Sequence, residues 1–199
     1  MDERLISEAK EYVTGLFQGN AGGHDVSHTM RVYGLALRIA ETEPEADLTL
    51  VTLGALLHDA DDAKLFATEN NENARRFLAA HGISGVEADV VCEIINGVSF
   101  SKNRGRKPAS LEGKIVQDAD RLDAIGAVGI ARTFAYGGEH GRPMEESVRH
   151  FYEKLLLIQE EMNTPAGKEI AAERHAFLEE FLRRYHEETG TDANDFTDR

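Results

Sequence analysis

A long apolar run in this chain ends abruptly in a cluster of titratable side chains. The segment LTLVTLGALL fills residues 48–57, and His58, Asp59, Asp61 and Asp62 follow it at once. Acids at a helix C-terminus interact unfavourably with the helix dipole. Charged side chains at the end of a buried helix also cost free energy unless a cation neutralises them. The cluster therefore favours a metal site over its alternative, a solvated helix end. On a continuing helix, Asp62 would share the face of the first two residues.

Two further segments hold candidate ligands. In HDVSHTMRV and KIVQDADRLDAIGAVGIAR, the histidines and acids at helical spacing are His24, His28, Asp118, Asp120 and Asp123. The residues alone do not choose among these five. Histidines scattered at a polar helix start, and buried ion pairs between an acid and an arginine, are the competing interpretations.

A basic segment stands out in an acidic chain. Lys102, Arg104, Arg106 and Lys107 fall within six positions of the longest expected loop, residues 96–110. Two interpretations stay open for this loop, an electropositive lid that binds phosphate groups and a mobile solvated loop. Small residues after Asp123, by contrast, are typical of close helix packing.

Helical spacing of apolar residues dominates the rest of the chain, and no strand-like alternation interrupts it. We predict an all-α bundle of about seven helices, with one long helical region over 111–136. The 199 residues suit a single domain over 1–199. Its core would cover about 5–186, and the polar tail 187–199 would fray.

Composition narrows the classes of partner. The 36 acidic and 22 basic residues give a net charge of -14, which repels polymeric nucleic acid. No stretch approaches the roughly 20 apolar residues that span a bilayer. The one cysteine, Cys92, cannot form an intramolecular disulfide, and the charged start MDERLISEAKEY does not look like a signal peptide. These features predict a cytoplasmic protein that binds neither membrane nor polymeric nucleic acid; they do not determine its oligomeric state.

The strings HDVSHTMRV, ALLHDADDAK, SFSKN, LEGKIVQDADRLDAIGAVGIARTFAYGG and MNTPAGKEIAAERHAFLEEFL resemble the HD-domain phosphohydrolase superfamily over roughly residues 5–186. They are similar to a subfamily of small bacterial and archaeal hydrolases that includes a nucleoside triphosphate pyrophosphohydrolase. The resemblance implies an HD-domain helical bundle. It also implies that the metal ligands are His28, His58, Asp59 and Asp120.

Two imidazoles and two carboxylates suit one divalent transition metal ion, with manganese favoured over nickel, cobalt, iron, zinc or magnesium. HD enzymes with several metals carry extra histidines between the HD pair and the last aspartate. Only His81 lies in that interval here. The resemblance therefore implies a site with one ion.

The resemblance further implies that Asp62 orients or deprotonates the attacking water and that Lys64 contacts substrate phosphate. The groups expected to bind substrate are His24, Arg31, Lys102, Arg104 and Arg121. Asp123 is expected to accept a hydrogen bond from the other ring nitrogen of a histidine that binds the metal. The favoured reaction converts a nucleoside triphosphate to monophosphate and pyrophosphate. Nucleoside monophosphate dephosphorylation is the alternative reaction, and a metal- and nucleotide-binding sensor without turnover is the alternative class.

Overall fold

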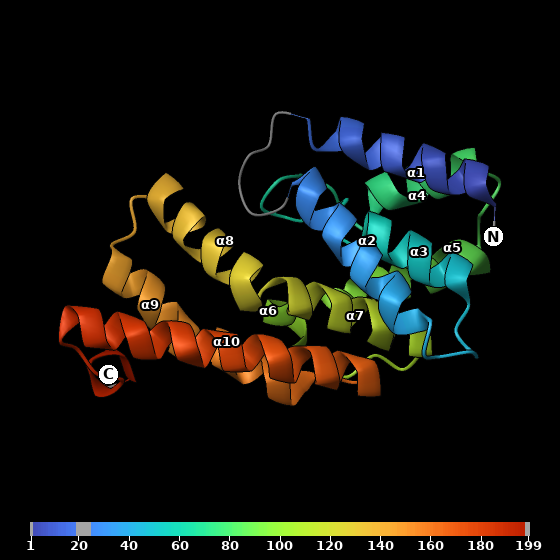
Figure 1. Cartoon of the computed structure of the whole chain (residues 1–199). Helices are drawn as coiled ribbons and strands as arrows, with labels where there is room; N and C mark the ends of the chain where they lie inside the picture. Colours follow the sequence, from blue (N-terminus) through green and yellow to red (C-terminus); the bar gives the residue numbers. More distant parts are fainter. Residues whose placement is uncertain (1, 19–24, 198–199) are drawn as a thin grey trace. The chain divides into compact units, whose positions relative to one another are not determined.

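The computed structural model describes residues 2–18 and 25–197 of the chain, and Figure 1 shows that the described part is built from helices. It is 73% helical and has no strand within the described residues, which confirms the all-α prediction. Eleven α-helices and one 3-10 helix, η1, are described, more than the seven or so expected. Contacts among them divide the chain into two compact units, residues 1–120 and 121–199. The single-domain prediction therefore stays a prediction.

The first unit is organised around one buried helix. Its helices are α1 (Glu3–Leu16), α2 (Val26–Ala40), α3 (Leu48–Leu57), α4 (Glu72–Ala80), α5 (Val86–Val98), α6 (Phe100–Asn103) and most of α7 (Leu111–Asp123). Helix α3 packs against α1, α2 and α5 (Figure 1). Every residue from Val51 to Leu57 is buried, as its apolar sequence predicted. Each large apolar side chain buried there contributes roughly 1.5–3 kcal/mol.

Capping side chains mark the start of the two helices of the first unit that carry His28 and Asp120, α2 and α7. Asp25 Oδ1 accepts a hydrogen bond of 2.7 Å from the His28 backbone N–H and so starts α2. Ser110 Oγ accepts one of 3.0 Å from Gly113 N–H at the start of α7. Each cap satisfies a backbone donor that has no partner within its own helix.

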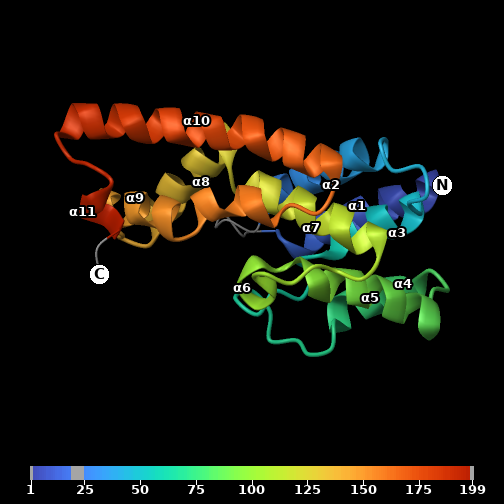
Figure 2. The same ribbon diagram turned by 90° about the horizontal axis from the view of Figure 1, so that it is seen from below.

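The second unit consists of α8 (Gly126–Glu139), α9 (Met144–Glu153), η1 (Leu155–Glu161), α10 (Pro165–Thr189) and α11 (Asn194–Thr197), together with the end of α7. Helix α10 packs against α8 and η1, and α11 packs against α9 (Figure 2). The sequence predicted a frayed tail over 187–199. Instead, α10 continues to Thr189, and the buried Phe196 stacks on Tyr152 with ring centroids 6.1 Å apart.

The long helix expected over 111–136 is wrong, because the chain turns between α7 and α8. Ile125 has an extended backbone, and Gly126 has φ +76°, a conformation that residues with a Cβ rarely adopt. Gly129 then lies so close to the turn that an added Cβ would be 2.2 Å from the Ala124 carbonyl oxygen. The small residues therefore serve a turn of the backbone, and Gly126 also permits the close packing that was expected, since an added Cβ would lie 2.9 Å from Arg174 Cγ on α10.

The loop expected over 96–110 also differs, since the four-residue helix α6 lies within it. Asn103 stabilises this short helix by donating from Nδ2 to the carbonyl oxygens of Asn96 and Ser99, at 2.9 and 3.1 Å. None of the helices in the described part of the chain combines the length and apolar character needed to cross a membrane.

Candidate metal centre

Three helices of the first unit bring four polar side chains together. His28 is the third residue of α2, in the first turn after the Asp25 cap. His58 is the C-cap of α3, and Asp59 follows it. Asp120 lies on α7. The segment of α3 before His58 is apolar and buried, so the core of the unit determines the positions of His58 and Asp59.

The four side chains point their ligand atoms at one another. His28 Nε2 lies 3.2 Å from His58 Nε2, 3.4 Å from Asp59 Oδ2 and 3.3 Å from Asp120 Oδ1. His58 Nε2 lies 3.3 Å from Asp59 Oδ2 and 3.8 Å from Asp120 Oδ1. Ligands about 2.1 Å from a common ion are about 3.0–3.4 Å apart at octahedral or tetrahedral angles. Four of the five distances lie in that range, and the fifth corresponds to a wider angle.

A hydrogen bond determines the tautomer of His58. Its Nδ1 lies 2.8 Å from the Ala55 carbonyl oxygen, which can only accept, so Nδ1 carries a proton. In the neutral ring Nε2 then has a free lone pair, and this lone pair faces the cluster. A backbone carbonyl in this position commonly orients a histidine that binds metal through its other nitrogen.

The cluster requires positive charge. Both imidazole side chains are 2% exposed, and the Asp59 and Asp120 side chains are 11% and 21% exposed. Burial lowers the pKa of His58, but the charges of Asp59 and Asp120 outweigh burial and raise it. Burial likewise raises the pKa of Asp120, but the hydrogen bond from His28 and the nearby imidazoles outweigh it and lower the pKa. A divalent cation meets the same requirement, so the donor set fits a metal ion.

Within the described residues, His28, His58 and Asp120 form a group of histidines and acids that can hold a metal ion. Asp59 belongs beside them on the distances above. His81 lies elsewhere, with Nε2 2.7 Å from Glu8 Oε2 and Nδ1 2.8 Å from the Phe77 carbonyl oxygen. The metal itself, its identity and the number of ions stay predictions.

The acids after the HD pair have different roles. Helix α3 ends at Leu57, so the argument that Asp62 shares a helical face with His58 was wrong. Asp61 instead accepts hydrogen bonds from the backbone N–H groups of Asn73 and Ala74, at 2.9 and 3.0 Å, and so caps α4 from a distance. This contact removes Asp61 from the acids that a cation must neutralise.

Asp62 is half-buried and uses one carboxylate oxygen to accept a 2.8 Å hydrogen bond from the Lys64 backbone N–H. Its other oxygen accepts no hydrogen bond from the residues that the structure describes. Lys64 is exposed, and its ammonium group has no acidic partner within the same residues. Their predicted roles in proton transfer and phosphate contact stay predictions.

The predicted substrate-binding residues lie in several places. His24 lies outside the described residues. Arg31 is half-buried on α2, one turn after His28. Lys102 and Arg104 are exposed at the end of α6, where the Arg104 guanidinium lies 6.0 Å from the centre of the Phe100 ring.

Arg121 and Asp123 belong to the second unit and have partners within it. Arg121, 2% exposed, donates at 2.7 Å to the Glu161 carbonyl oxygen and lies 3.2 Å from Glu161 Oε2. Asp123 Oδ2 lies 2.5 Å from an Arg132 nitrogen, the buried ion pair that was the competing interpretation for this acid. Their predicted roles toward substrate and metal stay predictions.

Sequence reasoning missed two buried amides of the first unit. Asn73 donates from Nδ2 to the Ala60 carbonyl oxygen at 2.8 Å and holds the turn after the HD pair. Gln117, fully buried on α7, donates to two carbonyl oxygens outside its own helix. An amide in the middle of the apolar pattern KIVQDA was a signal for the second of these.

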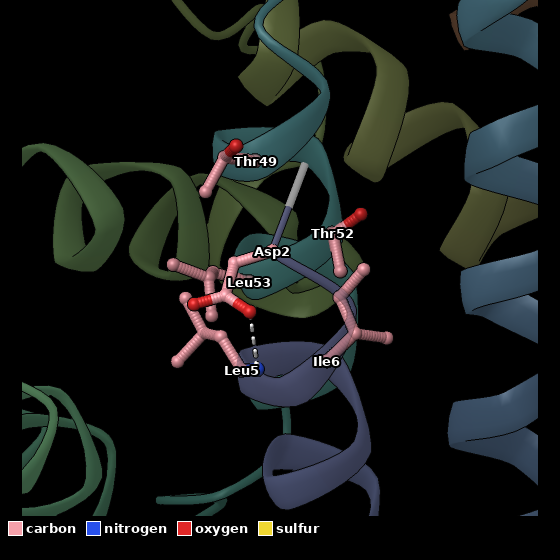
Figure 3. A pocket seen from close by; sticks show the side chains of 6 residues that line it. All are labelled: Asp2, Leu5, Ile6, Thr49, Thr52 and Leu53. Atoms are coloured by element: carbon pink, nitrogen blue, oxygen red, sulfur yellow. Dashed lines mark hydrogen bonds between the residues drawn. The ribbon is translucent and has the colours of Figure 1, made fainter.

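The small pocket in Figure 3 is not the metal centre. It lies between the start of α1 and the start of α3, and its lining includes Leu5, Ile6 and Leu53. Its volume of about 10 Å³ holds one water at most. Among the described residues that line it, Asp2 is the one acid and there is no histidine, so this pocket does not offer a metal site.

A family model described as the HD domain matches residues 25–125, which run from the Asp25 cap of α2 past Asp120. This match covers half of the chain and both parts of the HD signature. The chain belongs to the HD-domain family. The helical HD fold expected from the sequence is thereby confirmed.

Relatives extend the similarity over nearly the whole chain. The Bacillus subtilis protein YpgQ is 40% identical over 200 residues, covering 96% of this chain and 97% of that protein. A crystal structure of YpgQ in complex with ADP matches with a TM-score of 0.79 at 39% identity, covering 92% of this chain and 97% of the other. An HD-superfamily hydrolase from Bacillus thuringiensis matches with a TM-score of 0.77 at 35% identity, covering 96% and 99%. An HD-superfamily hydrolase is thus among the whole-chain structural relatives.

Proposed function

We propose that this protein is a metal-dependent phosphohydrolase that acts on a small phosphorylated substrate. The observation that carries the proposal is the convergence of His28, His58, Asp59 and Asp120 in a chain of the HD-domain family. These four residues would hold one divalent transition metal ion, with manganese favoured. When bound, the ion would polarise a phosphoryl group and lower the pKa of a water molecule.

The remaining chemistry falls to residues beside the cluster. The free oxygen of Asp62 would accept the proton of the attacking water. Lys64, the nearby cation of the same turn, would bind a phosphate oxygen as the substrate's charge shifts. Arg31 would serve the same purpose from α2, and Lys102 and Arg104 from α6 and the residue after it. His24, which lies outside the described residues, is proposed for this role from the sequence alone.

The substrate that we favour is a nucleotide. The YpgQ structure contains ADP, and the aligned part, which covers 92% of this chain, is 39% identical to it. For a nucleoside triphosphate, water would attack the α-phosphorus and the P–O bond to the bridging oxygen would break. Pyrophosphate leaves, the monophosphate retains the water oxygen, and the proton passes to Asp62. We place this reaction in the cytoplasm.

A screen of phosphorylated metabolites with added manganese and identification of products tests the proposal. We expect nucleoside monophosphate and pyrophosphate from a triphosphate, and no reaction after chelation of the metal. Orthophosphate from a monophosphate would instead identify a nucleoside monophosphate phosphatase. Nucleotide binding without turnover of any compound would identify a sensor and contradict the proposal.

A further inference from the structure

One buried amide joins three segments of the first unit. Gln117 Nε2 on α7 donates to the carbonyl oxygen of Gly97 at 2.7 Å and to that of Arg106 at 3.2 Å. An amide group has two hydrogens, so both bonds form together. The side chain is fully buried, and its loss would leave two carbonyl oxygens without this donor. Gln117 therefore ties the end of α5 and the basic residues after α6 to α7.

Packing at Pro108 fastens the same stretch a second time. A Cβ added at Gly97 would lie 3.4 Å from Pro108 Cγ, and one added at Gly113 would lie 2.8 Å from Pro108 Cβ. Pro108 thus packs against both glycines, and at Gly113 it leaves no room for a side chain. Together with the Asn103 hydrogen bonds, these contacts hold residues 102–107, here named the basic segment, at both ends.

The charged groups of the basic segment face solvent on this fixed backbone. Lys102, Arg104, Arg106 and Lys107 are exposed. Of these, Lys102, Arg106 and Lys107 form no ion pair with any residue that the structure describes. Exposed cations this close together, in a chain with a net charge of -14, suit an anionic ligand.

Helix α7 also carries the candidate metal ligand Asp120. Gln117 lies three residues before it, so the two are neighbours on the helix surface and about 4.5 Å apart along the axis. The tether of the basic segment is therefore one helical turn from Asp120. A change at Gln117 moves the segment without removing any ligand.

We propose that Gln117 is a positioning residue that holds the basic segment to bind the polyphosphate chain of a nucleoside di- or triphosphate. The inference rests on the proposed function and names its substrate class. Four clustered cations match the charge of a polyphosphate, whereas a monophosphate needs fewer. Gln117 touches neither substrate nor metal in this assignment and acts through the segment that it holds.

Limited digestion with trypsin tests the tether without measuring activity. Gln117→Met keeps the side-chain volume and removes the donor. We expect cleavage after Lys102, Arg104 and Arg106 to accelerate on the order of tenfold, with cleavage after the exposed Arg183 unchanged. Equal acceleration at all four sites would mean general destabilisation and overturn the proposal. If this variant does not fold, Pro108→Ala loosens the same segment and should accelerate cleavage at the same three sites, in addition to opening a new site after Lys107.

Kinetics then test the substrate class. Gln117→Met should raise KM for a nucleoside triphosphate on the order of tenfold, with kcat and bound metal nearly unchanged, because binding alone is weakened. In a Lys102→Ala, Arg106→Ala background it should add little, since the segment no longer binds phosphate. Independent, additive effects or loss of metal would overturn the positioning role.

Failure of the proposed function gives a different result. If the wild-type chain turned over no nucleotide, the proposed activity would fall, while the trypsin pattern would still decide whether Gln117 holds the segment. Equilibrium binding of ADP to the wild type and to Gln117→Met would then decide the ligand class. Equal ADP affinities in the two proteins would overturn that part of the proposal.

Discussion

Two sets of buried charged residues follow one another along α7 and after it, and they are neutralised in opposite ways. In the second unit, Arg121 meets Glu161 and Asp123 meets Arg132, so each of these carboxylates has an arginine from the same unit. In the first unit, Asp120 meets histidines and a further acid. The second unit supplies its own cations as side chains, whereas the first gathers electron-pair donors.

The contrast distinguishes ion pairs that need no further partner from a cluster that can take up a cation. Arginine cannot lose its proton in a protein, so an arginine pair is complete by itself. A neutral imidazole presents a lone pair, and this lone pair needs a proton or a metal ion as its partner. The comparison predicts that mutations in the first set change metal binding and the rate of hydrolysis. Mutations in the second set should change the free energy of unfolding.

His58→Ala should have the largest effect. It removes a nitrogen ligand, so we expect loss of bound metal and at least about a 10²-fold loss of rate. Elemental analysis and steady-state kinetics measure both. His140→Ala, which removes an exposed histidine of the second unit, is the control and should retain both. Undiminished metal in His58→Ala would exclude it as a ligand.

Asp62→Asn sharpens the comparison within the first unit. It should keep the metal and reduce kcat by about 10²-fold or more, because the amide cannot accept a proton from water. The Asx turn to Lys64 N–H can persist, since the amide oxygen still accepts. Hydrolysis at the wild-type rate with metal bound would show that another group is the base.

Asp123→Asn tests the second unit. Asp123 is 1% exposed in its side chain and Arg132 is 26% exposed, so loss of the carboxylate should destabilise the protein by about 2 kcal/mol. Urea denaturation measures this change, and metal content per folded molecule should stay the same. A fall in metal affinity at unchanged stability would reverse the assignment and support the role toward a metal ligand that the sequence suggested.

His150 gives the smallest effect. Burial, and then the charges of Lys154 and Arg142, lower its pKa to about 4 from 6.5, the opposite direction to His58. The unfolded chain binds the proton more readily than the folded chain. The stability that the neutral His150 provides is therefore complete above pH 6.5 and is lost as the pH falls toward 4. We expect a loss of about 1–2 kcal/mol, reduced by the solvent near this partly exposed ring. The difference in unfolding free energy between the wild type and His150→Gln, measured from pH 7 to 5, should show this slope, and parallel curves would contradict it.

Local pattern determined the helices but not where each one stops. The apolar run of α3 and its burial followed from composition, because a helix that is apolar all round must be central. The break after α7 depends on a positive φ at Gly126, and the length of α3 on a turn after Leu57. Both helix ends depend on a few backbone angles, and the helical spacing of apolar side chains does not predict those angles.

The sequence by itself determined that the chain is helical and that His58 and Asp59 follow its most buried helix. With a family resemblance it also selected His28 and Asp120 as their partners. Only the tertiary structure separated the remaining acids, because Asp61 and Asp123 have the same chemistry as ligands until their partners are seen. A carboxylate caps, pairs or binds metal according to which donors fold against it, and those donors lie far away in the sequence.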